Sequence, residues 1–235
     1  MDSFRVVARN TAPDSENRIH DDQTAAAYGF RGGLVPGVTV YGYLTVPVIR
    51  HFGEDWLARG AMRVRFLQPV YEGDEVVVTL SGSDVAASLA DGTVCASAEV
   101  SWPEDPPPSP DLYPEAPLPA DRPPASPQSL TPGRILGTLY VNLPLADPAA
   151  LLTLSNHLLM QNVKLGPWIH AASEVRHFSL VRDGELLSVR GRIADRFERK
   201  GHRFVVLDIL VVAGARPIQY VRHTAIYELR PPASG

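Results

Sequence analysis

Residues 61–85 read AMRVRFLQPVYEGDEVVVTLSGSDV, and residues 172–196 read ASEVRHFSLVRDGELLSVRGRIADR. When residues 73–75 are placed over residues 183–185, each segment gives two strands joined by a tight turn of acidic residues and glycine. Apolar residues alternate along residues 76–80, which is typical of antiparallel strands buried on one face. The match predicts that the chain contains the same structural unit twice.

Each copy is expected to be one part of a larger unit with a helix and further strands. Apolar stretches of helical length precede the copies at residues 37–52 and 148–163, and the second has Asp147 as a candidate N-cap and Pro148 at the first helical position. Helices that are apolar all round suit a curved sheet that wraps them. Further strands are predicted at residues 92–102, 202–214 and 218–229. The pattern predicts an α+β internal duplication.

The region between the copies differs in composition. Residues 103–133 hold 12 of the 22 prolines in the chain. Proline cannot donate to a sheet and disfavours helix in the residue before it, so we expect an extended, polyproline-like linker, with a docking motif for a proline-binding domain as the alternative. The predicted division is a first unit at residues 1–102, the linker, and a second unit at residues 134–235.

Composition excludes several classes of function. The chain is 45% apolar and 20% charged with a net charge of -4, so a nucleic-acid partner is not expected. No apolar run reaches the roughly 18–20 residues that span a bilayer, so no membrane partner is expected. The first ten residues lack the features of a signal peptide, and the single cysteine, Cys95, suits a reducing cytoplasm. No CxxC or HExxH motif predicts a metal site.

One loop carries the functional signal. Residues 17–38 read NRIHDDQTAAAYGFRGGLVPGV and lead into the first predicted helix. The loop resembles the hydratase loop of the MaoC-type dehydratases, or (R)-specific enoyl-thioester hydratases, which runs approximately Gly-Asp-x-Asn-Pro-(Ile/Leu)-His. The following segment, residues 65–76, resembles the strand that comes next in that family. The positions of the loop that match are Asn17, Ile19, His20, Ala25, Gly29, Phe30 and Gly37.

The resemblance implies a double hot-dog fold, in which two antiparallel sheets each wrap a central helix and lie side by side with both helices across one face. It implies reversible hydration of 2-enoyl thioesters to 3-hydroxyacyl thioesters, carried on coenzyme A or an acyl-carrier protein, without a cofactor. It also allows a homodimer. Only the first unit has the loop, so one active site per chain is expected, with the second unit as a wall of the acyl tunnel.

The resemblance also assigns catalytic roles. His20 would transfer the proton, because imidazole titrates near neutral pH. The catalytic Asp of the family lies five residues before the His, where this chain has Ser15, so Asp14 is the candidate replacement. Asn17 would support the catalytic loop, or would only cap a turn.

Other residues are expected to bind the substrate. Gly37 would bring a backbone N–H to the thioester oxygen at the start of the helix. Arg18 stands where the motif has proline and would pair with a carboxylate or a carrier phosphate. Phe30, Val38 and Tyr41 are expected around the acyl group.

The second half contains five histidines, at positions 157, 170, 177, 202 and 223. We interpret them as structural, with His170 as the exception to watch because "GPWIH" (166–170) weakly echoes the start of the first helix. The basic run at residues 195–203 is interpreted as a solvated turn, with attraction of carrier phosphates as the alternative.

Two other functions remain open from the sequence. Some hot-dog proteins hydrolyse thioesters with a carboxylate and water at nearly the same place, so a thioesterase is one alternative. A non-enzymatic acyl-binding or partner protein is the other.

Overall fold

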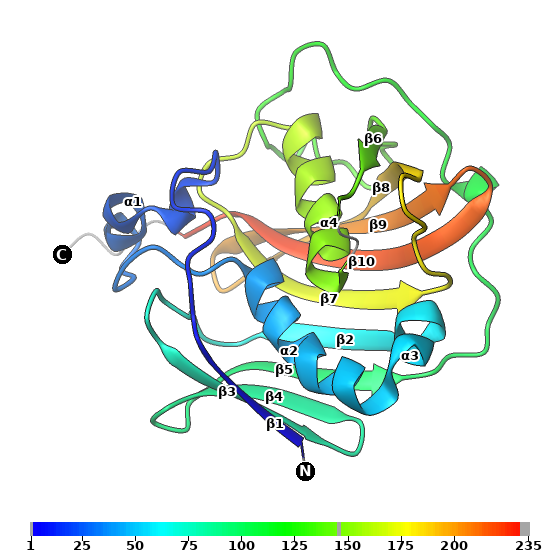
Figure 1. The fold of residues 1–235 in the computed structure, drawn as a ribbon. Helices are drawn as coiled ribbons and strands as arrows, with labels where there is room; N and C mark the ends of the chain where they lie inside the picture. The colour runs from blue at the N-terminus through cyan, green and yellow to red at the C-terminus, as the bar shows by residue number, and fades with distance from the viewer. Residues whose placement is uncertain (1, 145–146, 231–235) are drawn as a thin grey trace.

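The computed structural model describes residues 2–144 and 147–230. Within them, ten strands form one antiparallel sheet in the order β1-β3-β4-β5-β2-β7-β10-β9-β8-β6 (Figure 1). The strands of the first half are β1 (Asp2–Val7), β2 (Ala61–Phe66), β3 (Glu75–Ser81), β4 (Asp84–Leu89) and β5 (Val94–Ser101). Those of the second half are β6 (Leu139–Asn142), β7 (Ile169–His177), β8 (Leu186–Arg199), β9 (His202–Ala213) and β10 (Arg216–Glu228).

The two halves meet where β2 pairs with β7, with Ala61 opposite Arg176 and Arg65 opposite Ala172. From this seam outward, the first half runs β2, β5, β4, β3, β1 and the second half runs β7, β10, β9, β8, β6. Corresponding strands therefore occupy corresponding places, which confirms the predicted α+β duplication. The two expected sheets are joined into one by the β2–β7 hydrogen bonds.

Two long helices, α2 (Gly37–Phe52) and α4 (Pro148–Asn162), lie on one face of the sheet (Figure 1). Both lie within one residue of the predicted bounds, and the Asp147 side chain accepts from the N–H of Ala150 as an N-cap. The helices approach closely at Gly42, where a Cβ would lie 3.1 Å from that of Ala149. The shorter elements are α1 (Asp22–Ala27), α3 (Glu54–Arg59) and the 3-10 helices η1 (Arg18–His20) and η2 (Pro110–Leu112).

The main core lies between the helices and the inner face of the sheet. Tyr41 and Leu44 of α2 and Leu158 of α4 are completely buried, and they share one cluster with the inward-facing residues of the strands. Along β3, buried residues alternate with more exposed ones, as the sequence predicts. None of the helices within residues 2–144 and 147–230 combines the length and apolar character needed to cross a membrane.

The proline-rich segment packs against the second half. Tyr113 is 5% exposed and contacts a small outer cluster with Leu210 and Val212 of β9, while Leu130 is buried in the main core. Strand β9 is consequently buried on both faces, which explains its nearly continuous apolar sequence. The segment runs between the halves and covers the outer face of the sheet at β9. The division at residues 102 and 134 stays a prediction.

Replacing Tyr113 with alanine should lower the free energy of unfolding by about 2–4 kcal/mol, because a large buried side chain is removed from its packing contacts with β9. Leu112→Ala is the matched control, since Leu112 is 58% exposed, and should change stability by less than about 0.5 kcal/mol. Urea unfolding followed by circular dichroism measures both. Equal effects of the two substitutions would show that the segment contributes no packing.

Candidate active site

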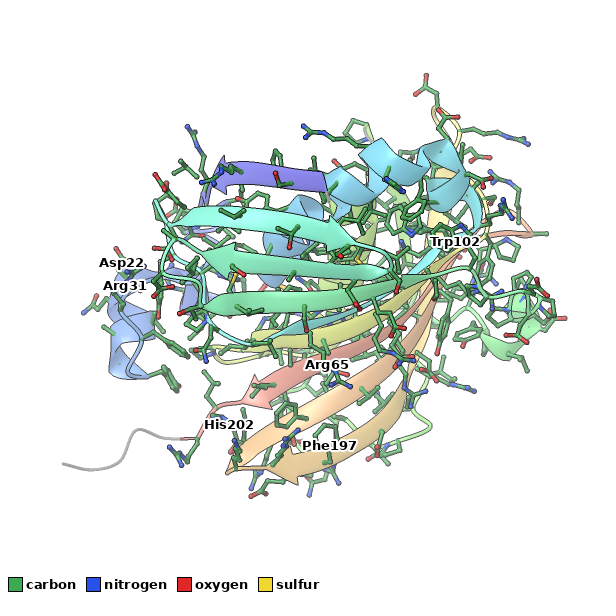
Figure 2. All side chains as sticks on the ribbon, turned by 90° about the horizontal axis from the view of Figure 1, so that it is seen from below. Asp22, Arg31, Arg65, Trp102, Phe197 and His202 are labelled. Carbon is green, nitrogen blue, oxygen red and sulfur yellow. The ribbon has the colours of Figure 1, made fainter. Side chains whose placement is uncertain are left out.

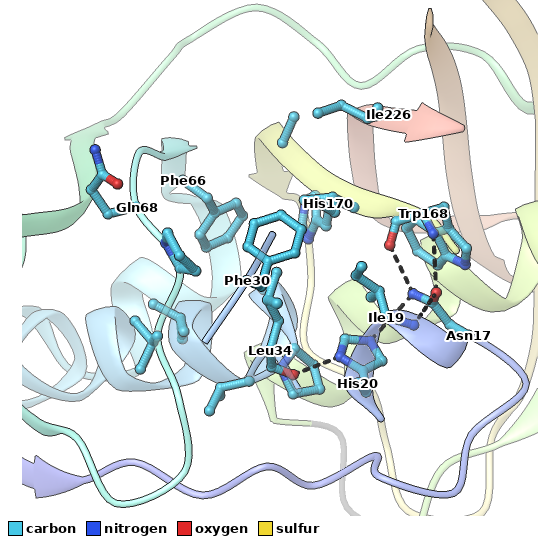
Figure 3. A pocket seen from close by; sticks show the side chains of 18 of the residues that line it. Asn17, Ile19, His20, Phe30, Leu34, Phe66, Gln68, Trp168, His170 and Ile226 are labelled. Carbon is cyan, nitrogen blue, oxygen red and sulfur yellow. Dashed lines mark hydrogen bonds between the residues drawn. The ribbon is translucent and has the colours of Figure 1, made fainter. Parts of the chain in front are cut away.

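A cavity of about 270 Å³ lies at the end of the sheet where β2 ends and β7 begins (Figure 3). The first half supplies the η1 segment, the loop after α1, the start of α2 and the residues after β2. The second half supplies Asn156 of α4, the start of β7 and the end of β10. The cavity therefore lies at the seam between the two halves.

His20 lines this cavity at the end of η1. Its Nδ1 lies 2.6 Å from the carbonyl oxygen of Leu34. A carbonyl can only accept, so Nδ1 carries the proton, and in the neutral ring Nε2 is the acceptor. Burial lowers the pKa of His20 below its ordinary value, and the bond to Leu34 offsets part of this decrease. His20 is therefore a neutral base near pH 7.

The loop after α1 folds back onto His20 and fixes its position. The N–H of Leu34 donates to the carbonyl of Ile19 at 3.2 Å, and the Asn10 amide donates to the carbonyl of His20 at 2.7 Å. A Cβ at Gly33 would lie 2.1 Å from that same carbonyl oxygen. Only glycine fits this approach, which accounts for one of the glycines in the RGGL stretch.

Asn17 ties the His20 loop to the second half. Its Nδ2 donates to the carbonyl of Trp168 at 3.0 Å, and its Oδ1 accepts from the N–H of Trp168 at 3.1 Å. The same Nδ2 lies 3.3 Å from His20 Nε2 (Figure 3). Oδ1 also caps η1 by accepting from Ile19. The 95% buried Asn17 thus holds the loop, the second half and the imidazole together.

The start of α2 forms another part of the wall. The first N–H groups of a helix have no partner within it, and Pro36 at the N-cap provides no side-chain cap. Gly37 lines the cavity, and a Cβ there would lie 3.0 Å from Nδ1 of His170. The His170 ring thus supplies a packing reason for this glycine. The helix terminus can accept a partly negative oxygen from the cavity.

His170 is buried in a polar chain behind this wall. Its Nε2 lies 2.8 Å from Ser173 Oγ, which lies 3.1 Å from Nδ1 of His223. Burial, and secondarily the neighbouring His223, lowers the pKa of His170 well below its ordinary value. The His170 ring also meets Phe66 edge to face, with ring centroids 4.7 Å apart. His170 is accordingly a neutral, firmly packed wall residue.

The polar groups of the cavity are amides and imidazoles. Among the described residues that line it, none is Asp or Glu. Asn156 of α4 has a buried Oδ1 without a hydrogen-bond partner. The thiol of Cys95 donates to the carbonyl of Ala87 at 3.2 Å. No group of three or more His, Cys, Asp or Glu side chains suited to a metal occurs in the part of the chain that the structure describes.

The structure brings together four of the nine residues expected at the site: Asn17, His20, Phe30 and Gly37 line the cavity. The expected acidic partner of His20 is not there. Asp14 is exposed and does not line the cavity, and Ser15 donates instead to the carbonyl of Asn17 at 3.2 Å. Neither side chain borders the space in which a substrate would lie.

The other three expected residues also lie outside the cavity lining. Arg18 is exposed and forms an ion pair with Asp21 at 3.2 Å. Of the two partners expected for Arg18, a carboxylate and a carrier phosphate, the structure contains the carboxylate. Val38 and Tyr41 are buried in the main core. The Tyr41 hydroxyl has no hydrogen-bond partner there, and burial raises the pKa of Tyr41. These two residues pack the helix and do not border the cavity.

Sequence reasoning missed most contributions of the second half. Asn156, Trp168, Ile169 and His202 line the cavity with His170. The GPWIH echo contains three of these five residues, and the basic run at residues 195–203 contains a fourth, His202. The sequence contains no signal for Asn156, because a single amide residue within an apolar helix forms no local pattern that indicates a binding site.

No protein-family model matches the sequence, and no curated protein sequence matches it. Solved structures do match. A putative oleoyl thioesterase from Lactobacillus plantarum has a TM-score of 0.59 and 12% identity, covering 97% of this chain and 96% of that one. A GphF dehydratase variant has a TM-score of 0.58 and 12% identity, with 97% and 93% coverage. A conserved hypothetical protein of Mycobacterium tuberculosis, described as having a double hotdog fold, has a TM-score of 0.57 and 14% identity, with 96% and 95% coverage.

The fold is a double hot-dog. At these identities the likeness extends to the fold alone. The double hot-dog explains why the cavity lies at the seam: each unit contributes one central helix and one sheet half, and their ends meet around His20.

Asn17→Ala should lower the free energy of unfolding by about 1–3 kcal/mol, because the main-chain groups of Trp168 lose their partners in a buried place. Chemical denaturation measures the change. Asp14→Ala is the control within the same loop and should stay within about 0.5 kcal/mol of the parent protein. An Asn17→Ala variant as stable as the parent would contradict a role of Asn17 in joining the two halves.

Proposed function

We propose that this double hot-dog is an acyl-thioester dehydratase of the MaoC-like type, which interconverts 3-hydroxyacyl and 2-enoyl thioesters with His20 as the proton-transfer group. The observation that carries the proposal is the fixed tautomer of His20. A neutral imidazole with Nε2 as its acceptor borders the cavity next to a helix N-terminus. The small volume, about 270 Å³, suits a short acyl group.

In the direction of dehydration, His20 Nε2 takes the proton from C2 of the 3-hydroxyacyl thioester. The electron pair of that C–H bond moves toward the thioester carbonyl and gives an enolate. The imidazolium then returns the proton to the hydroxyl on C3, the C–O bond breaks, and water leaves as the C2–C3 double bond forms. His20 is neutral again at the end, so atoms and charge balance with one catalytic group.

The enolate oxygen would lie at the N-terminus of α2, where the free N–H groups and the helix dipole stabilise negative charge. The carbonyl of Leu34 would stabilise the imidazolium through Nδ1–H, in place of a carboxylate. The Asn17 amide holds the ring in position and must share Nε2 with the substrate. Asn156 offers an unpartnered oxygen that can accept from the C3 hydroxyl.

Thioester hydrolysis is the second candidate. A similar fold occurs in a putative oleoyl thioesterase. In this reaction His20 would take a proton from water that attacks the carbonyl carbon. The C–S bond would then break, and the imidazolium would return the proton to the leaving thiolate. The same helix terminus would stabilise the oxyanion. The two reactions differ in whether a free thiol appears.

Incubation with crotonyl-coenzyme A distinguishes the reactions. We expect the enoyl absorbance to fall without release of thiol, and His20→Ala to reduce the rate about 10²- to 10⁴-fold through loss of acid–base catalysis. Asp14→Asn is the matched control, because it removes the carboxylate that the sequence motif favoured, and should leave the rate within about twofold.

Each other result has a defined meaning. Thiol release that depends on His20 would replace the dehydratase by a hydrolase. Turnover unchanged in His20→Ala would exclude the proposed site. Absence of both signals in the folded protein would leave an acyl-binding role and contradict the proposal.

The pH dependence follows from the lowered pKa of His20. His20 must be neutral to accept a proton, so kcat/KM should level off toward neutral pH. It should fall in acid, as the imidazole becomes protonated, with a midpoint below the ordinary histidine pKa of 6.5. A pH–rate profile with crotonyl-coenzyme A measures this. An acid limb with its midpoint above pH 6.5 would contradict the assignment.

A further inference from the structure

The hairpin between β8 and β9 reaches the cavity. His202, the first residue of β9, lines the cavity together with Ile226 and Leu229 near the end of β10. Figure 2 shows His202 at the same end of the molecule as Asp22 and Arg31, which belong to the segment that contributes His20 and Leu34 to the cavity. The two residues of the hairpin turn, Lys200 and Gly201, lie directly before His202.

Unpaired positive charges gather at this turn. Arg199, Lys200 and Arg230 are exposed, and none forms an ion pair with a described residue, whereas Arg203 is paired with Glu228 at 2.8 Å. A Cβ at Gly201 would lie 2.9 Å from Cδ of Arg230, so the Arg230 side chain lies against the turn. The whole chain has a net charge of -4, so the cluster does not follow from overall composition.

His202 adds a directed donor to this cluster. Its Nδ1 accepts from the backbone N–H of Arg230 at 3.1 Å. In the neutral ring Nε2 therefore carries the proton. Lys and Arg donors around such a group form a site for an anion with several oxygens.

The backbone at Lys200 supplies an independent observation. Lys200 has φ 53°, and within residues 2–144 and 147–230 it is the only residue other than glycine with a positive φ. A two-residue turn with positive φ at both positions favours Asn-Gly or Gly-Gly over a lysine. A lysine here is therefore less favourable for the turn than asparagine or glycine, and the chain nevertheless keeps a cation at this position.

We propose that Arg199, Lys200 and Arg230 bind phosphate on the carrier arm of the thioester, while the acyl end occupies the cavity. This inference rests on the proposed function, since it assigns the carrier of the same substrate. The recognised chemistry is a phosphorylated pantetheine, which coenzyme A and an acyl-carrier protein share. His202 lines the cavity, whereas the exposed cations beside it do not, so the phosphate would lie outside the cavity and the thioester within it.

Calorimetric titration with thioethers tests the proposal, because thioethers can be neither hydrated nor hydrolysed and binding is measured whether or not turnover occurs. The ligands are S-butyl-pantetheine, S-butyl-4′-phosphopantetheine and S-butyl-coenzyme A. Lys200→Asn should weaken binding of both phosphorylated ligands roughly two- to fivefold and leave S-butyl-pantetheine unchanged. The double variant Lys200→Asn/Arg199→Gln should weaken them further, and raised salt should reduce the difference.

Two controls separate charge recognition from damage to the fold. Lys200→Asn places a residue that tolerates positive φ in the turn, so its unfolding midpoint should equal or exceed that of the parent. Arg5→Gln removes a positive charge from β1, the strand at the far edge of the sheet, and should leave all three affinities unchanged. If Arg5→Gln weakened the binding of the phosphorylated ligands as much as Lys200→Asn does, the effect would come from net charge alone. This result would overturn the proposed phosphate site.

The ligands also separate the two sources of phosphate. Tighter binding of S-butyl-coenzyme A than of S-butyl-4′-phosphopantetheine supports the site with a nucleotide carrier, and equal binding supports it with a carrier protein. Two results would overturn this inference and leave the proposed function intact. The first is that the parent protein binds the ligands with and without phosphate equally tightly. The second is that Lys200→Asn weakens the binding of S-butyl-pantetheine as well. If the thioethers bind with the expected differences but crotonyl-coenzyme A is not turned over, only the proposed function is overturned. If none of the three thioethers binds, both proposals are overturned.

Discussion

The pairing of one side-chain amide with one peptide group makes the site possible. The Asn17 side chain forms hydrogen bonds with both the N–H and the carbonyl of Trp168, a residue 151 positions away. Asn162 pairs in the same way with the main chain of Gly137 inside the second half. In both places an amide provides one donor and one acceptor to a buried strand start that has no sheet partner for them. The position of the His20 loop thus depends on the folding of the other half.

The two units share their strands and central helices and differ in what lies at the ends. The first unit supplies the base, His20, and the helix terminus at Gly37, while the second supplies the Asn156 amide and the smaller part of the wall. Because β2 and β7 form one hydrogen-bonded seam, the two contributions are held in fixed register. A duplicated scaffold therefore gives one asymmetric site, with function carried by loops and helix ends.

Sequence periodicity and capping predicted the fold well, because alternation along β3 and the Asp147 cap of α4 are local signals. The candidate site was predicted in part. His20 and the start of α2 were predicted because they lie in one contiguous motif. The motif places the acidic partner five residues before His20, at Ser15, but the loop turns so that the Ser15 hydroxyl donates to the main chain. Contacts between the halves, such as Asn156 beside the cavity, leave no local pattern, and the aromatic anchor Tyr113 is hidden among prolines.

The Leu34 carbonyl that accepts the hydrogen bond from His20 Nδ1–H belongs to the main chain, so the path of the loop determines the imidazole tautomer, and not the identity of a neighbouring side chain. Point substitutions at position 34 alter bulk and leave this oxygen in place. An inserted or deleted residue between Gly32 and Pro36 would instead move it. The chemistry of His20 is thus tolerant of changes in amino-acid type nearby and sensitive to changes in loop length, the reverse of a histidine oriented by a carboxylate side chain.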